Sequence, residues 1–171
     1  LYQAKDSEIY TAKEREQIEN YVPWGCMLEQ SQVIFQGHQW QLERLLSEHK
    51  DHFVIKKGLS NKGADVCLGK YVTLNEWLAF IAAVDDKSEW VVQQYCETEQ
   101  TLAAFASGVL SPAKAVWGSF SCAGEYAGSF VRFIEEQENN QGIINSDRGA
   151  WESIVFEVTE NESGAAVTND S

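Results

Sequence analysis

The chain has 171 residues, of which 44% are hydrophobic and 23% are charged, and its formal net charge at pH 7 is −13. This length suits one ordinary domain with an apolar core. The two prolines, the twelve glycines without a fixed repeat and the four cysteines exclude a collagen-like chain and a disulfide scaffold. Charged or strongly polar residues interrupt every stretch of about 18 residues, so the sequence predicts no membrane span.

The acidic charge is uneven along the chain. Residues 133–171 carry nine acids and one cation, Arg148, whereas residues 50–70 carry five lysines against Asp51 and Asp65. A negative protein surface repels phosphate backbones, whose binding needs clustered lysine and arginine. We therefore expect no direct nucleic-acid binding, and we expect any partner to have a basic surface.

The four cysteines show no pattern of a metal or redox site. Cys26, Cys67, Cys96 and Cys122 are spaced 41, 29 and 26 residues apart, without a Cys-x-x-Cys pair. Cys67 and Cys96 have apolar neighbours, which is typical of buried thiols. We expect four reduced thiols and a cytoplasmic, intracellular protein.

The first predicted element is a polar helix near the N-terminus. Thr11 and Glu14 have the spacing of a capping box, in which a hydroxyl and a carboxylate each satisfy an unpaired backbone amide. The helix is expected to run to about Val22, where residues 23–25 end it.

A second helix is predicted from about Met27 to His49. Gly37 bends or interrupts it, and the apolar residues of its second half share one face. These residues are Leu42, Leu45 and Leu46.

A β-hairpin is predicted over residues 53–72. Two short apolar runs typical of strands flank residues 58–63, which include the glycine, serine and asparagine residues of a turn. The lysines near this turn could face a phosphate, but the glycine–lysine motif of a P-loop is missing. We expect a solvated hairpin tip, with charges that protect an edge strand.

Helices dominate the prediction for the rest of the chain. Thr73 and Glu76 form a second capping box, which starts a helix to about Val84. Apolar residues at helical spacing predict three more helices. They cover residues 88–108, 112–117 and 118–138.

These elements predict an α+β fold that is predominantly helical, with one small antiparallel β-hairpin. Ile154, Phe156 and Val158 would share one face of a possible C-terminal strand. Residues 1–158 are expected to form a single globular domain, because no repeat or linker divides them. Residues 159–171 contain no aromatic residue and are polar and acidic, which predicts a disordered acidic tail.

Two histidines have a spacing that could suit a metal ion. His49 and His52 would reach the same ion from one helix face, and a third ligand such as His38 would have to come from elsewhere. A helix C-terminus also explains His49, because cations complement the helix dipole there. The sequence therefore predicts no metal and no cofactor, and His49 and His52 are the candidates if a metal binds.

Cys122 is the candidate nucleophile of an alternative Cys/His enzyme. Residues 118–124 do not form the Gly-x-Ser-x-Gly motif, and no histidine follows His52, which excludes the Ser, acid, His order of α/β-hydrolases. The thiol would need His38 or one of the other two histidines close in space.

Tryptophans and acids supply the predicted binding surface. The six tryptophans exceed what a core of this size needs, and exposed aromatic side chains are good interface anchors. The predicted contact residues are Trp24, Trp40, Trp151, Glu135, Glu136 and Glu138.

The sequence thus predicts a non-catalytic acidic binding protein that engages a protein partner with a basic surface. Inhibitors, immunity proteins and nucleic-acid mimics act in this way: acids steer the partner, and an aromatic patch is then desolvated. The alternatives are a small metal- or Cys/His-dependent enzyme and a structural protein that self-associates as a homo-oligomer. No nucleic acid or membrane is expected as a partner.

Overall fold

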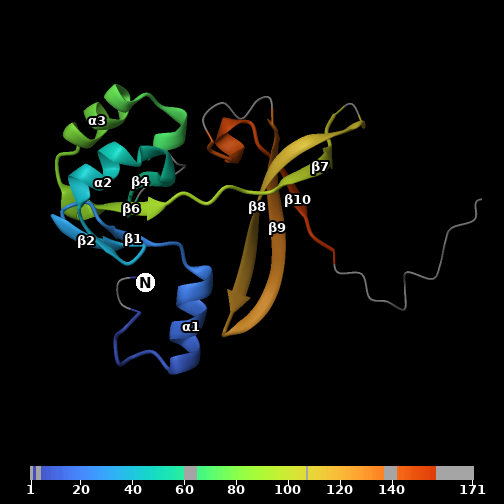
Figure 1. The fold of residues 1–171 in the computed structure, drawn as a ribbon. Coiled ribbons are helices and arrows are strands. Elements are labelled where there is room, and N and C mark those ends of the chain that lie inside the picture. The colour runs from blue at the N-terminus through green and yellow to red at the C-terminus, as the bar shows by residue number, and fades with distance from the viewer. Residues whose placement is uncertain (1, 3–4, 60–64, 107, 137–141, 157–171) are drawn as a thin grey trace, which may run out of the picture. The chain divides into compact units, whose positions relative to one another are not determined.

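The computed structural model describes residues 2, 5–59, 65–106, 108–136 and 142–156 (Figure 1). These residues form two compact units. Unit 1 comprises the described residues up to Thr98 together with residues 142–143, and unit 2 comprises residues 99–136 and 144–156. The single domain expected over residues 1–158 stays a prediction, and the expected tail, residues 159–171, lies outside the described residues.

The prediction of a predominantly helical fold is wrong. In the described residues, strands account for 40% and helices for 28%, and ten strands form three antiparallel sheets. The sheets bury apolar side chains that the sequence places at spacings compatible with either a helix or a strand.

The first helix, α1 (Ala12–Tyr21), confirms the N-terminal prediction. The Glu14 amide donates a hydrogen bond to the Thr11 hydroxyl at 3.3 Å, and the Thr11 amide donates to the Glu14 carboxylate at 2.7 Å. These two bonds are the predicted capping box. The helix is polar, and it buries Ile18.

The helix predicted over residues 27–49 is wrong in its first half. Its place is taken by three strands and one short helix: β1 (Gly25–Met27), β2 (Gln32–Phe35), β3 (His38–Gln41) and α2 (Leu42–Glu48). Along β2, buried and exposed side chains alternate. Gln36 and Gly37 have φ values of 49° and 77°, so they form the tight turn of the β2–β3 hairpin.

The β-hairpin predicted over residues 53–72 is confirmed in its two strands. β4 (Phe53–Lys57) and β5 (Val66–Leu68) pair antiparallel, with Ile55 opposite Cys67. Part of the predicted tip, residues 60–64, lies outside the described residues. The hairpin is followed by a 3-10 turn, η3 (Gly69–Tyr71), rather than by more strand.

The helix after this hairpin is also confirmed. α3 (Leu74–Ala82) starts at a second capping box, in which the Glu76 amide donates to the Thr73 hydroxyl and the Thr73 amide donates to the Glu76 carboxylate. Trp77 on this helix is fully buried, and its Nε1 donates to the Leu46 carbonyl at 3.0 Å.

The helix predicted over residues 88–108 is wrong. β6 (Trp90–Gln94) belongs to unit 1 and β7 (Gln100–Ala104) to unit 2. β6 lies between β1 and β4, in a sheet of order β1-β6-β4-β5. Val92 on β6 is fully buried, opposite Cys26 on one side and Ile55 on the other. This central position outweighs the helical spacing of the surrounding residues.

One apolar core holds unit 1 together. The sheet, the β2–β3 hairpin, α2 and α3 all contribute to it. Its buried members are Trp24, Cys26, Leu28, Val33, Phe35, Leu42, Leu45, Leu46, Phe53, Ile55, Trp77 and Val92.

Unit 2 is built on one four-stranded sheet, of order β10-β9-β8-β7 (Figure 1). The helices predicted over residues 112–117 and 118–138 are wrong, because β8 (Leu110–Cys122) and β9 (Glu125–Glu135) form a long antiparallel hairpin there. Ala123 and Gly124 form its turn, with φ values of 52° and 85°. The possible C-terminal strand is confirmed as β10 (Trp151–Ile154).

Short 3-10 turns join several of these elements. They are η2 (Lys50–His52), η4 (Lys87–Glu89) and η6 (Ser146–Arg148). In the described ranges, the helices are too short or too polar to cross a membrane.

Candidate functional site

Two of the three histidines are neighbours on the surface of unit 1. The ring centroids of His49 and His52 are 6.2 Å apart, and Trp40 contacts the His49 ring edge-on at 5.3 Å. His38, on β3, is exposed. Among the residues that the structure describes, no three histidine, cysteine, aspartate or glutamate side chains are grouped to hold a metal ion. The structure therefore brings His49 and His52 together without a described third ligand.

Two of the four cysteines, Cys26 and Cys67, have surroundings that suit structural thiols better than nucleophiles. Burial raises the pKa of Cys26 to about 12, and burial is also the main cause that raises the pKa of Cys67. Both thiols therefore keep their protons at neutral pH, and the thiolate is the nucleophilic form. Cys122 is exposed at the end of β8, in unit 2, which contains no histidine.

The half-buried Lys50 makes structural contacts. Its Nζ donates to the carbonyl oxygens of Gly69 at 2.7 Å and Val72 at 2.8 Å, and it pairs with the Asp51 carboxylate. Lys50 therefore joins η2 to η3 and satisfies two backbone carbonyls. Lys50 is one of the five lysines of residues 50–70, and its charge is partly neutralised within the fold by Asp51.

The three tryptophans of the predicted binding surface have different environments. Trp24 is 8% exposed and packs in the core of unit 1, where its Nε1 donates to the Ile34 carbonyl at 2.8 Å. Trp40 is half-buried on β3. Trp151 is 46% exposed on β10 and contacts the Phe105 ring edge-on at 6.1 Å. Trp151 thus offers the most surface of the three.

The predicted acidic contact residues lie near the end of β9. Glu135 is half-buried on the strand, and Glu136 is exposed and accepts a hydrogen bond from the Gln100 side-chain amide. Glu138 lies outside the described residues.

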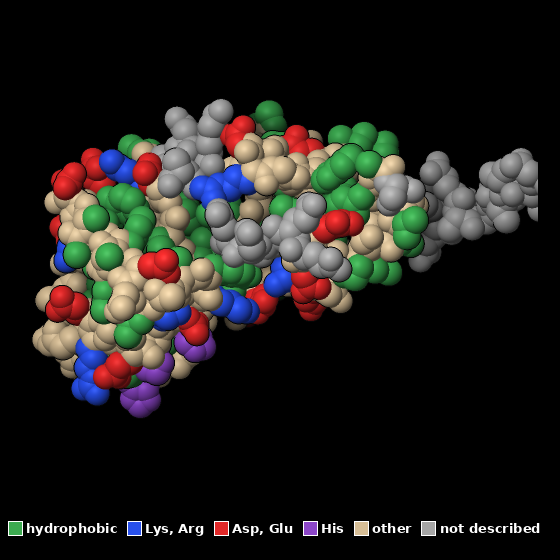
Figure 2. All heavy atoms as spheres, turned by 90° about the horizontal axis from the view of Figure 1, so that it is seen from above, with side chains coloured by type: hydrophobic (Ala, Val, Ile, Leu, Met, Phe, Trp, Pro, Cys, Tyr) green, Lys and Arg blue, Asp and Glu red, His purple; other side chains and the backbone are tan. Residues whose placement is uncertain are grey.

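The sheet of unit 2 exposes many large apolar side chains, which we call the apolar sheet surface. Figure 2 shows hydrophobic side chains, in green, on the face of the molecule that it presents. The members are Leu102, Val109, Leu110, Val116, Trp117, Phe120, Tyr126, Trp151, Ile154 and Phe156.

Both faces of the sheet contribute to this surface. On one face, Trp117 is opposite Val131, and the Tyr126 hydroxyl lies 2.9 Å from the Ser129 hydroxyl. On the other face, the Phe120 ring stacks on the Phe130 ring at 5.3 Å. Gly118 makes room for that stack, because a Cβ on Gly118 would lie 2.2 Å from the Phe130 ring.

One charged pair interrupts the apolar residues of the second face. The Arg132 guanidinium lies 4.9 Å from the centroid of the Phe130 ring, and its Nε is 4.0 Å from a Glu152 oxygen. The Arg132 Nε is buried and has no hydrogen-bond acceptor among the described residues.

Sequence reasoning placed Trp117, Phe120 and Tyr126 on helices and missed this surface. The available signal was the enrichment of aromatic and β-branched residues in this segment, where Val116, Trp117 and Phe120 lie close together, which is more typical of a strand than of a helix. Ala123 and Gly124 then follow at the position of a two-residue turn, but alanine is a rare residue at positive φ.

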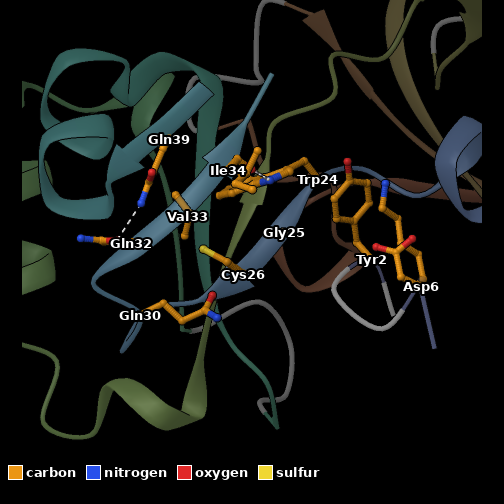
Figure 3. A pocket seen from close by; sticks show the side chains of 11 residues that line it. Tyr2, Asp6, Trp24, Gly25, Cys26, Gln30, Gln32, Val33, Ile34 and Gln39 are labelled. Atoms are coloured by element: carbon orange, nitrogen blue, oxygen red, sulfur yellow. Dashed lines mark hydrogen bonds between the residues drawn. The ribbon is translucent and has the colours of Figure 1, made fainter. Parts of the chain in front are cut away.

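A second candidate site is an open hollow in unit 1, of about 880 Å³, which we call the edge cleft. Residues from β1 and β2 form its walls, and residues near the N-terminus line one end (Figure 3). Three glutamines also line it, and two of them are linked across the β2–β3 hairpin: the Gln39 amide donates to the Gln32 side-chain carbonyl at 2.8 Å. The lining residues are Tyr2, Lys5, Asp6, Trp24, Gly25, Cys26, Gln30, Gln32, Val33, Ile34 and Gln39.

The comparisons with known proteins give no relative. No protein-family model, no curated protein and no solved structure matches this chain.

Proposed function

We propose that this chain is a non-catalytic binding protein, and that the sheet of unit 2 docks a protein partner with a basic surface. The observation that carries the proposal is the apolar sheet surface. Trp117 and Tyr126 are each 65% exposed on an antiparallel sheet. Aromatic side chains on a rigid element offer a large contact area at a small cost in conformational entropy, which makes them strong interface anchors.

The architecture of unit 2 supports this proposal. A sheet with apolar side chains on a face is stable when a second layer buries that face. The described part of unit 2 contains no α-helix and no second sheet. Exposed apolar patches on a protein surface mark interaction sites, and the face that carries Trp117 and Tyr126 is the one proposed to dock the partner.

The charge of unit 2 supports a basic partner. Six acids and three cations lie in its described residues. Glu125 precedes Tyr126 at the hairpin turn, and Glu136 is exposed next to β7. Acids around an apolar contact area attract a basic protein at long range and raise its association rate at low salt.

A photo-crosslinking experiment tests the proposal. The full chain would carry p-benzoylphenylalanine in place of Trp117, and a control chain would carry it in place of Tyr21, which is 76% exposed on α1 in unit 1. Both chains would be irradiated in an extract of the source cells. We expect an adduct with a distinct basic protein from the Trp117 position alone, because interface anchors lie within reach of the partner.

The association rate then tests the charge. The partner identified in the adduct should bind the unmodified chain at least about tenfold faster at low salt than at high salt, because screening removes electrostatic steering. Identical adducts from both positions, or an association rate independent of salt, would contradict the proposal. Adducts between two copies of the chain would favour the self-associating structural protein instead.

A further inference from the structure

We infer that the edge cleft of unit 1 binds an extended peptide, which adds a strand between β1 and β2. This inference is independent of the proposed function of unit 2. It rests on the direction of backbone groups in two strands that end their sheets, and on the hollow between them.

β1 is an edge strand whose outer backbone groups point away from β6. The Gln94 amide donates to the Trp24 carbonyl, and the Leu28 amide donates to the Trp90 carbonyl. Hydrogen-bonded pairs alternate along an antiparallel ladder, so Cys26 is also bonded to β6. The amide and carbonyl of Gly25, between Trp24 and Cys26, therefore point outward.

The same reasoning applies to β2. The Leu42 amide donates to the Ser31 carbonyl, so the bonded positions of β2 are Val33 and Phe35. The backbone groups of Gln32 and Ile34 therefore point away from β3. Of these groups, the Ile34 carbonyl already accepts the Trp24 indole N–H at 2.8 Å.

The two outer edges line the same hollow. Gly25 and Cys26 come from β1, and Gln32, Val33 and Ile34 come from β2, as Figure 3 shows. The volume, about 880 Å³, lies within the range of about 300–1,000 Å³ that is common for ligand pockets.

This arrangement identifies the chemistry of the ligand. An extended chain presents amides and carbonyls on both of its edges, and added strands derive their affinity mainly from main-chain hydrogen bonds. The lining contains one cation, Lys5, which is paired with Glu19, and one acid, Asp6. We therefore expect an uncharged segment. The side chains of the bound peptide alternate between two sides. Those on the side of Val33 and Cys26 would be small and apolar, and those on the side of the glutamines would be polar.

A displayed library of random linear peptides is the probe for this site. Selection against the full chain should enrich uncharged, proline-free sequences, and a synthetic copy of an enriched peptide should protect the amides of Gly25, Gln32 and Ile34 from hydrogen exchange. The same peptide with N-methyl groups on alternate residues should bind at least about tenfold more weakly, because the methylated amides cannot donate hydrogen bonds to the neighbouring strand.

Two substitutions at one position provide the matched control. Gln32→Pro removes an outward amide at the first residue of β2, where proline is tolerated in a strand, and should weaken the peptide at least about fivefold. Gln32→Ala keeps that amide, loses the side-chain bond to Gln39, and should bind within about twofold of the original chain. Near-ultraviolet circular dichroism would verify that both variants are folded. The inference is wrong if no sequence is enriched, if protection maps elsewhere, or if the two variants bind alike.

Discussion

Gly69 shows how a single residue positions two turns of unit 1. A Cβ built on Gly69 would lie 1.9 Å from the Lys50 carbonyl oxygen, although the φ of this glycine is not in the left-handed region. The reason for glycine here is therefore close backbone approach rather than backbone conformation. The Lys50 ammonium donates to the Gly69 carbonyl in return, so η2 and η3 are joined from both sides.

We expect Gly69→Ala to destabilise the protein by about 1–3 kcal/mol, because the added methyl group has to displace backbone. Gly58→Ala is the matched control, since its Cβ would meet only the Glu89 carbonyl, at 3.3 Å, and the expected loss is below about 1 kcal/mol. Urea unfolding measured by tryptophan fluorescence would compare them. If Gly69→Ala and Gly58→Ala lower the free energy of unfolding equally, the backbone of η2 does not approach Gly69 as closely as the structure shows.

At the scale of whole elements, the helix caps are the signals that sequence and structure share. Thr73 and Glu76 satisfy each other's backbone amides at the start of α3. The Thr73 amide and the Thr73 hydroxyl both donate to the Glu76 carboxylate, and these two bonds hold the pKa of the Glu76 carboxyl below its usual range. The Thr73 hydroxyl accepts one of the amides that a helix N-terminus leaves unpaired.

We expect Thr73→Ala to lower the free energy of unfolding by about 1 kcal/mol, whereas Thr73→Ser keeps the accepting hydroxyl and should lower it by less than half as much. Thermal unfolding followed by circular dichroism at neutral pH would give both values. If Thr73→Ser and Thr73→Ala lower the free energy of unfolding equally, the methyl group of Thr73 rather than its hydroxyl stabilises α3.

The sequence prediction failed for whole elements, because it assigned helices to segments that form strands. Thr11, Thr73 and the hairpin over residues 53–72 were predictable because caps and turns depend on residues close in the chain. The strands β6 to β9 were not predictable, because their apolar residues also fit the spacing of a helix. Only burial between strands that are distant in the sequence decides that these segments form strands. Ala123, a turn residue with φ of 52°, concealed the β8–β9 hairpin in addition.

For the molecule as a whole, the sequence suggested a surface with exposed aromatic side chains but not where on the fold this surface lies. The excess of tryptophan suggested exposed aromatic side chains, and Trp151 is exposed on the sheet of unit 2, but its role in binding stays a prediction. Trp24 is instead a core residue, because its neighbours Phe35 and Phe53 reach it from β2 and β4. The edge cleft was not predictable, since it depends on which strands end a sheet, and that is decided by pairing far along the chain.

The pH dependence of stability is a further property of the whole molecule, since it sums groups from several elements. The pKa values of the Glu14 and Glu76 carboxyls are lowered, chiefly by hydrogen bonds from backbone amides. A lowered pKa contributes stability that is present above the ordinary value of about 4.5 and is lost as the pH falls below it. We therefore expect stability to decrease on acidification below about pH 4.5.

The alkaline limit has a different cause. Burial raises the pKa of the Cys26 thiol from 9.0 to about 12, and burial, aided by the hydrogen bond to Tyr71, raises the pKa of Tyr95. The unfolded chain loses these protons at lower pH than the folded chain does. The contribution of Cys26 is therefore fully present below about pH 9 and falls as the pH rises, by up to about 1.4 kcal/mol per pH unit, and the contribution of Tyr95 begins to fall near pH 10.

Urea unfolding over a series of pH values would measure this slope. We expect Cys26→Ala to flatten the decrease between about pH 9 and 11, while the Tyr95 contribution remains. The comparison concerns the slope and not the absolute stability, because removing a buried thiol also leaves a small cavity at every pH. Cys96→Ala is the matched control, since Cys96 is exposed. A slope that Cys26→Ala leaves unchanged would mean that the Cys26 thiol is accessible to water although its side chain is buried against the core.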